Sequence, residues 1–191
     1  MQLINIGPSG IPQGYAQITA NDIANIAIAT YGPAVSITDR IDPKTPQECK
    51  FSMQYVLAHA AHYGSVRIEA FEAERMSDPA IQAMLGQIDL STDPAVDAEF
   101  PARRAAHVTI TTKDGRQLTH YQPTRKGDPD LPLTDDELDA KFIELANPVL
   151  GNELTNSLLQ KLRQLDEISL ATALDFTVLK GNHTAGKNLP N

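Results

Sequence analysis

The chain has 191 residues, enough for one ordinary domain or two small ones with a buried core. Hydrophobic residues make up 41% and charged residues 21%, which is the composition of a globular protein and excludes wholesale disorder. The 24 acidic residues outnumber the 16 basic ones, and the net charge of −8 argues against nucleic acid as the main partner.

The sequence carries no pattern typical of membrane insertion or export. No apolar run approaches the roughly 18 to 20 residues of a membrane span, and the first ten residues lack the basic and apolar regions of a signal peptide. The single cysteine, Cys49, excludes an internal disulfide and suits a reducing compartment. We therefore expect a cytoplasmic protein that does not bind membranes.

The first third of the chain predicts a lead-in, a strand and a helix. Residues 1–20 are broken by glycines and prolines and predict irregular structure. Residues 22–31 are apolar or small on both faces, which predicts a largely buried strand, and residues 32–44 predict a loop. A capping box of Thr45 and Glu48, with Pro46 at the first helical position, predicts one helix that continues to residue 61. Gly64 is its expected stop.

The middle of the chain predicts a short helix, a brief strand and a hairpin. Asp78 and Pro79 begin the helix, residues 87–90 form the strand, and a polar stretch covers residues 91–104. Residues 106–112 and 117–122 flank Asp114-Gly115, a preferred two-residue type I′ turn. That turn would pair Lys113 with Arg116 and place His107 and His120 together on the polar face of the hairpin.

The last third predicts three helices. A second capping box, Thr134 to Glu137, opens the first; residues 154–165 carry leucines at helical spacing, and residues 170–179 form a shorter third helix. We expect a lead-in at 1–20, an α+β domain at 21–150, helices at 151–180 and a flexible tail at 181–191. Because strands and helices do not alternate regularly, the expected fold is a two-layer α-β sandwich, a small sheet with a hairpin packed on helices.

The residues alone give no complete catalytic set. His59 and His62 share a helix without a third ligand, and Cys49 lacks an implied base, so we expect neither a metal nor a cofactor. Acidic residues at 128–139 do not have the spacing of a calcium loop and suit a helix start. His107 and His120 remain a candidate acid–base pair.

Two stretches resemble the 2-methylcitrate dehydratase family, also called MmgE/PrpD. Residues 42–58, DPKTPQECKFSMQYVLA, are similar to the family's P-x-T-x-x-(E/D)-A-K-F-S-x-x-Y-x-x-A segment. Residues 114–116 and 126–142, DGR and KGDPDLPLTDDELDAKF, are similar to its D-G-R and R-G-D-P-x-N-P-(L/M)-(S/T)-D-x-E-L-x-x-K-F segments. Cys49, Lys126 and Leu131 depart from the usual alanine, arginine and asparagine.

The resemblance implies a C-terminal lid domain beside the active-site cleft of a lyase-type enzyme acting on small di- or tricarboxylates. The family's main acid–base residues lie in a separate helical domain, so we expect this chain to be catalytically incomplete alone. The resemblance places four residues beside the cleft as candidate substrate-binding groups, a phenol and three cations: Tyr31, Arg40, Lys44 and Lys50.

The apolar stripes of the last helices predict a partner. It is either a second copy, giving a homodimer, or a separately encoded helical half. Two alternatives stay open: a non-enzymatic dimerising or regulatory module derived from this family, and an independent enzyme that uses His107 and His120.

Overall fold

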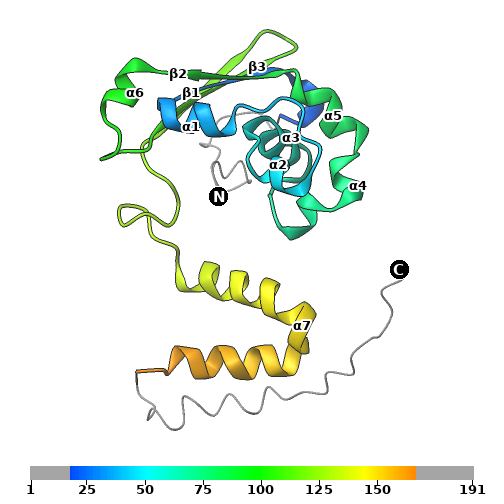
Figure 1. Ribbon diagram of the computed structural model, residues 1–191, viewed down its shortest axis with the longest axis vertical. Coiled ribbons are helices and arrows are strands. Elements are labelled where there is room, and N and C mark those ends of the chain that lie inside the picture. The colour runs from blue at the N-terminus through cyan, green and yellow to red at the C-terminus, as the bar shows by residue number, and fades with distance from the viewer. Residues whose placement is uncertain (1–17, 167–191) are drawn as a thin grey trace. The chain divides into compact units, whose positions relative to one another are not determined.

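A computed structural model describes residues 18–166, and the chain divides between Pro132 and Leu133 into two compact units (Figure 1). The first unit is α+β, as the sequence predicts. Its elements in chain order are a 3-10 turn (Ala20–Asp22), β1 (Ile23–Thr30), α1 (Gly32–Thr38), α2 (Pro46–Lys50), α3 (Met53–Tyr63), a second 3-10 turn (Ile68–Phe71), α4 (Ala73–Met76), α5 (Pro79–Leu85), β2 (Ile88–Thr92), α6 (Pro94–Ala98), β3 (Ala106–Thr112) and β4 (Gln117–Gln122).

The four strands form one mixed sheet in the order β2-β1-β3-β4. β1 and β2 are parallel, and the helices α1 to α5 connect them, as a parallel pair requires. β1 pairs with β3, and β3 with β4, in the antiparallel sense. The ends of β1 and β2, the start of β3 and the end of β4 therefore meet at one edge of the sheet.

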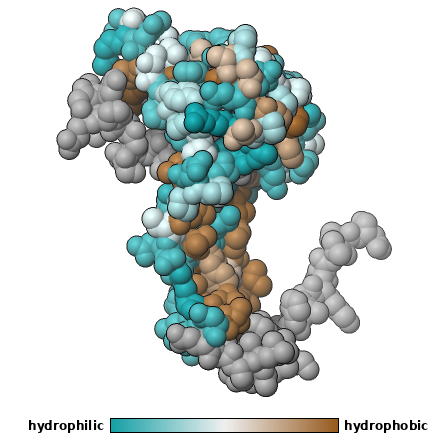
Figure 2. Space-filling model, turned by 90° about the vertical axis from the view of Figure 1, so that its left-hand side faces the viewer, coloured by the Kyte–Doolittle hydropathy of each residue, from teal (hydrophilic) through white to brown (hydrophobic). Residues whose placement is uncertain are grey.

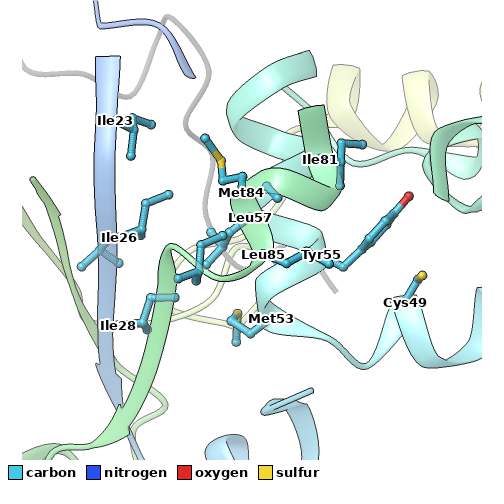
Figure 3. Close-up of a cluster of buried hydrophobic side chains, with 13 residues drawn as sticks. Ile23, Ile26, Ile28, Cys49, Met53, Tyr55, Leu57, Ile81, Met84 and Leu85 are labelled. Atoms are coloured by element: carbon cyan, nitrogen blue, oxygen red, sulfur yellow. The ribbon is translucent and has the colours of Figure 1, made fainter. Parts of the chain in front are cut away.

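The core lies between one face of this sheet and the helices. Ile26 and Ile28 point from β1 toward Leu57 of α3 and Leu85 of α5, and all four side chains are buried (Figure 3). On the opposite face of β1, Ala27 is exposed. The prediction that β1 is buried on both faces is therefore wrong: its small side chains face outward instead of packing under a second layer.

The region before α3 differs from the prediction in two places. Residues predicted as a loop form α1, whose early turn contains Pro33, a residue that favours the first turn of a helix. The single helix predicted from Pro46 is divided into α2 and α3 at Ser52. The capping box of Thr45 and Glu48 and the left-handed Gly64 at the end of α3 are both confirmed.

The hairpin has the predicted strands but a different turn. The backbone N–H of Thr112 donates to the carbonyl of Arg116 at 2.9 Å, so the loop contains three residues, Lys113 to Gly115. Gly115 has φ 86°, the left-handed conformation that closes three-residue hairpin loops. The predicted pairing of Lys113 with Arg116 is therefore wrong by one residue, which moves every β4 side chain to the other face.

The second unit is a bent helix, α7 (Asp135–Arg163), interrupted at Gly151, whose φ is 74° and ψ 165°. The predicted capping box of Thr134 and Glu137 begins it. The Arg163 guanidinium lies 3.0 Å from the Asp135 carboxylate, so the two halves of α7 fold back on each other. These halves are two of the three predicted C-terminal helices; the third, at 170–179, lies outside the described residues. Within residues 18–166, no helix is long and apolar enough to cross a membrane.

Candidate functional site at the sheet edge

Polar and aromatic side chains gather where β1 and β2 end. We call the sheet-end cluster the set formed by Tyr31, Asp93, Phe100, His107, Tyr121 and Arg125. Tyr31 follows β1 and Asp93 follows β2, while His107 is the second residue of β3 and Tyr121 the last but one of β4. In open α/β sheets, ligands bind outside the carboxyl ends of the parallel strands, and β1 and β2 form such a parallel pair.

Tyr31 is held from two sides. Its ring stacks on Phe100, with 4.9 Å between the ring centroids and 13° between the planes. The backbone N–H of Gly32 donates to Asp97 Oδ1 at 2.7 Å, which ties the start of α1 to α6. The Tyr31 side chain stays partly exposed, so the phenol is fixed in direction yet open to a ligand.

His107 lies on the open face of the sheet, opposite Tyr121. The two ring centroids are 4.5 Å apart. His107 Nε2 lies 3.9 Å from Asp93 Oδ2, and Asp93 also accepts a hydrogen bond from the backbone N–H of Ala95 at 2.8 Å, where it caps α6. The imidazole thus faces a carboxylate on one side and an aromatic ring on the other.

Arg125 lies in a loop after β4 whose residues hydrogen-bond to one another. Its Nη2 and Nε donate to the two oxygens of Asp128 at 2.7 and 3.1 Å, and Thr124 Oγ1 donates to the same carboxylate at 3.1 Å. The hydrogen bonds from Arg125 hold the pKa of Asp128 below its ordinary value. The Asp128 carboxylate likewise raises the pKa of Arg125, and the nearby Tyr31 acts in the same direction.

The predicted cations do not join this cluster. Arg40 pairs with Glu48 at 3.0 Å, and the backbone N–H of Lys44 donates to the same carboxylate at 2.8 Å. The Lys44 side chain pairs with Asp42. Tyr31 and Arg40 flank the two ends of α1, a seven-residue helix that is about 10 Å long at 1.5 Å per residue.

Lys50 lies at the end of α2, with its ammonium 5.5 Å from the centre of the Phe71 ring. The structure therefore brings Arg40 and Lys44 together around one glutamate, and places Tyr31 and Lys50 in separate surroundings. Arg40 and Lys44 are largely exposed, so their ion pairs are open to exchange with another anion.

The predicted pair of His107 and His120 is wrong. The one-residue shift at the turn places His120 opposite Val108, on the face that bears the core, whereas His107 lies on the open face. His120 is exposed, and its Nε2 lies 3.2 Å from Gln122 Oε1. The sequence pattern gave no signal for the contacts of His107, because the one with Tyr121 depends on this register and the one with Asp93 on the pairing of β2, β1 and β3.

The other chemistry-bearing residues are packed in the core. His59 is buried and its Nδ1 donates to the carbonyl of Ser65 at 2.9 Å, while burial lowers its pKa. Burial also raises the pKa of the Cys49 thiol, which disfavours a reactive thiolate. Within residues 18–166, no three His, Cys, Asp or Glu side chains are placed to hold a metal ion.

Comparison with known proteins gives a consistent result. Residues 13–166 match the model of the MmgE/PrpD C-terminal domain. Cis-aconitate decarboxylase of Mus musculus is 28% identical over 145 residues, which cover 74% of this chain and 30% of that protein. The Homo sapiens protein of the same name is 26% identical over 149 residues, 78% of this chain and 31% of that protein.

A third relative has a different name. The 2-methylcitrate dehydratase of Cupriavidus necator is 32% identical over 105 residues, which cover 52% of this chain and 22% of that protein. The matched part of the chain thus spans less than a third of the length of each of these relatives.

Proposed function

This chain belongs to the MmgE/PrpD family through the family's C-terminal domain, and from that premise we propose that it is the lid part of a lyase-type enzyme for small di- or tricarboxylates. Compounds such as 2-methylcitrate are the proposed substrates. With 2-methylcitrate, a base removes a proton alpha to a carboxylate while an acid assists the departure of the hydroxyl group as water. Cis-aconitate has no hydroxyl group and would instead lose CO2 and take up a proton at the same carbon. The lid supplies groups that hold the substrate, and a helical domain, in the same polypeptide or another, supplies the main acid and base.

The position of Tyr31 is the observation that carries this proposal. Its phenol lies at the carboxyl end of β1, is oriented by the stack on Phe100, and contributes to the raised pKa of Arg125. A fixed phenol beside a guanidinium suits a ligand that carries carboxylates, because both groups donate hydrogen bonds. The relatives' names support the same ligand class, since cis-aconitate and 2-methylcitrate are both tricarboxylates.

Arg40, Lys44 and Lys50 complete the proposed substrate-binding set. An arriving carboxylate would replace Glu48 as the partner of Arg40 and Asp42 as the partner of Lys44, exchanges between exposed ion pairs that cost little. Lys50 is exposed, and its ammonium lies over the ring of Phe71, where a ligand carboxylate can reach it.

The second unit supports a need for a partner. Leu138, Leu145 and Val149 on the first half of α7 are 45%, 52% and 81% exposed. Figure 2 shows hydrophobic side chains gathered along the face of this unit that is in view. We propose that a helical domain of the family covers them. If a second copy of the chain covers them instead, the alternative function is a non-enzymatic dimerising or regulatory module in the cytoplasm.

Activity assays with and without a helical domain test the proposal. The full chain is incubated with 2-methylcitrate or cis-aconitate, and the product is measured. The assay is run once with the chain alone and once with the family's helical domain from the same organism added. We expect turnover only with the helical domain. Tyr31→Phe should lower kcat/KM at least about tenfold, because a lost hydrogen bond to a charged group is worth about 1.5–3 kcal/mol.

Tyr63→Phe is the matched control. This change also removes a phenolic hydroxyl. The Tyr63 hydroxyl donates to Asp78, and the Tyr63 ring lies against Arg75. Tyr63 is the last residue of α3, at the opposite end from the capping Ser52. Its kcat/KM should stay within about twofold of the parent chain, since the change lies outside the proposed site. Full activity from the chain alone would contradict the need for a helical domain, and an unchanged Tyr31→Phe would contradict the site.

A further inference from the structure

His107 has no task in the proposed function, although it lies in the same cluster as Tyr31. Its Nε2 is 3.9 Å from Asp93 Oδ2, and its ring is 4.5 Å from that of Tyr121. Half of the side chain, 51%, is exposed. A carboxylate and an aromatic ring therefore orient the imidazole without enclosing it, which leaves the rest of the ring open to a ligand.

The register of the sheet places His107 beside Tyr31. Ala29 is the partner of His107 across β1 and β3. Tyr31 lies two residues beyond Ala29 with an extended backbone, φ −77° and ψ 148°, so its side chain leaves the sheet on the same face. Diagonal neighbours of this kind lie about 7–8 Å apart, which is within reach of one small ligand.

The carboxylates at this edge are already engaged. Asp93 accepts from the backbone N–H of Ala95, Asp97 accepts from Gly32, and Asp128 is paired with Arg125. Of these contacts, only the Arg125 ion pair offsets the charge of a carboxylate. The hydrogen bonds from neutral backbone N–H groups orient Asp93 and Asp97 without cancelling their charge.

Arg104, just before β3, adds an exposed cation to the same edge. Its guanidinium makes no hydrogen bond or ion pair with other residues in the part of the chain that the structure describes. The positive charge of Arg104 would thus attract an anionic ligand toward the edge of the sheet where His107 lies.

We propose that His107 recognises one carboxylate of the di- or tricarboxylate ligand and so contributes to specificity. The inference rests on the proposed function. In its imidazolium form, His107 keeps Nε2 toward Asp93 and donates from Nδ1 to the ligand, while Tyr31 donates to the same ligand from the neighbouring strand. The imidazolium is required for the charge-assisted hydrogen bond, so we expect affinity to be higher at about pH 6 than at about pH 8.

The titratable groups that contact His107 are Asp93, from the end of β2, and Tyr121 on β4. From β1, the facing residue is Ala29, which does not titrate. The His107→Gln variant therefore shows whether a pH dependence of binding comes from this ring.

NMR of the histidine rings tests the inference on the full chain, free and in its complex with the helical domain. Cis-aconitate is the probe, at about pH 6 and pH 8. We expect the His107 resonances to shift at the lower pH and much less at the higher one. His107→Gln should weaken cis-aconitate binding about tenfold or more at the lower pH. His120→Gln, on the opposite face of the hairpin, should bind as the parent chain does.

Two results would overturn the inference: His107 resonances that do not respond in either sample, or His107→Gln and His120→Gln variants that bind alike. The proposed function fails separately. If His107 responds to cis-aconitate but no turnover appears with the helical domain, the ligand site stands and the lyase function is wrong. If Tyr31→Phe loses activity while His107→Gln binds and turns over normally, only the role of His107 is wrong.

Discussion

At the scale of single residues, His59 couples stability to pH. Its side chain is 1% exposed, Nδ1 donates to Ser65, and Nε2 has no hydrogen-bond partner among the described residues. Burial lowers the pKa because the imidazolium would lose its hydration. Since the folded pKa lies below the unfolded one of about 6.5, folding favours the neutral ring.

We therefore predict that the free energy of unfolding has a contribution from His59 that is complete above about pH 6.5 and is lost as pH falls below it. Urea unfolding of the parent chain and of His59→Gln, at about pH 7.5 and pH 5.5, measures this contribution. The loss of stability between the two pH values should be smaller in the variant. An equal loss in both chains would contradict it.

His62→Gln is the matched control for this experiment. His62 is on the same helix, one turn beyond His59, and is partly exposed. Because its ring is not buried, its replacement should change the pH dependence of the free energy of unfolding less than His59→Gln does. The comparison separates the buried ring from the general effect of removing a histidine.

At the scale of elements, Ser52 determines where α3 begins. Its hydroxyl accepts from the backbone N–H of Tyr55 at 3.0 Å and donates to the carbonyl of Arg40 at 2.6 Å. The side chain is 1% exposed. One buried hydroxyl thus caps the helix and ties it to the segment after α1.

We predict that Ser52→Ala lowers the free energy of unfolding by about 1–2 kcal/mol, because a helix cap and a buried hydrogen bond are lost together. Urea unfolding of the intact chain gives the value. Ser36→Ala, on exposed α1, removes a hydroxyl that only donates to Pro33 of its own turn, and should cost less than about 0.5 kcal/mol. Equal costs for the two variants would show that Ser52 has no special role in starting α3.

Local side-chain chemistry made much of the fold predictable. The capping boxes at Thr45 and Thr134, the Asp78 cap and the stop at Gly64 each need only a few neighbouring residues, and all four are confirmed. The break at Ser52 was not predictable in the same way, because it depends on the carbonyl of Arg40 twelve residues away. The apolar pattern of residues 46–61 cannot reveal a hydrogen-bond acceptor that comes close to Ser52 only when the chain folds.

The hairpin shows how one residue changes the predicted site. Asp114-Gly115 permits both a two-residue turn and the three-residue loop that forms, and the choice is made by the Thr112 hydrogen bond to Arg116. That choice sends His107 and His120 to opposite faces. The family resemblance indicated Tyr31, but Asp93 and Phe100 come from the stretch predicted to be merely polar. Their contacts join the segment around α6 to the end of β1, where the Asp93 N–H donates to the Thr30 carbonyl and Phe100 stacks on Tyr31.

At the scale of the whole molecule, net charge opposes the association of two copies of the chain, whereas exposed apolar surface favours association. The net charge of −8 makes two copies repel each other, whereas Leu145 and Val149 favour burial against another surface. Salt therefore distinguishes the two proposed partners. Raising it from about 0.05 to 0.5 M should strengthen a homodimer by screening, and should weaken binding to a helical domain that offers basic residues.

We predict that Leu145→Ser and Val149→Ser together weaken association with the partner at least tenfold, without lowering the stability of the first unit. Burying a leucine or valine side chain contributes about 1.5–3 kcal/mol, and about 1.4 kcal/mol is a tenfold change in the dissociation constant. Analytical ultracentrifugation of the chain, alone and with the helical domain, measures the association. Asn156→Ser, an exposed polar change on the second half of α7, is the control and should leave it unchanged. If the double variant associates as tightly as the parent chain, these leucine and valine side chains do not form the interface.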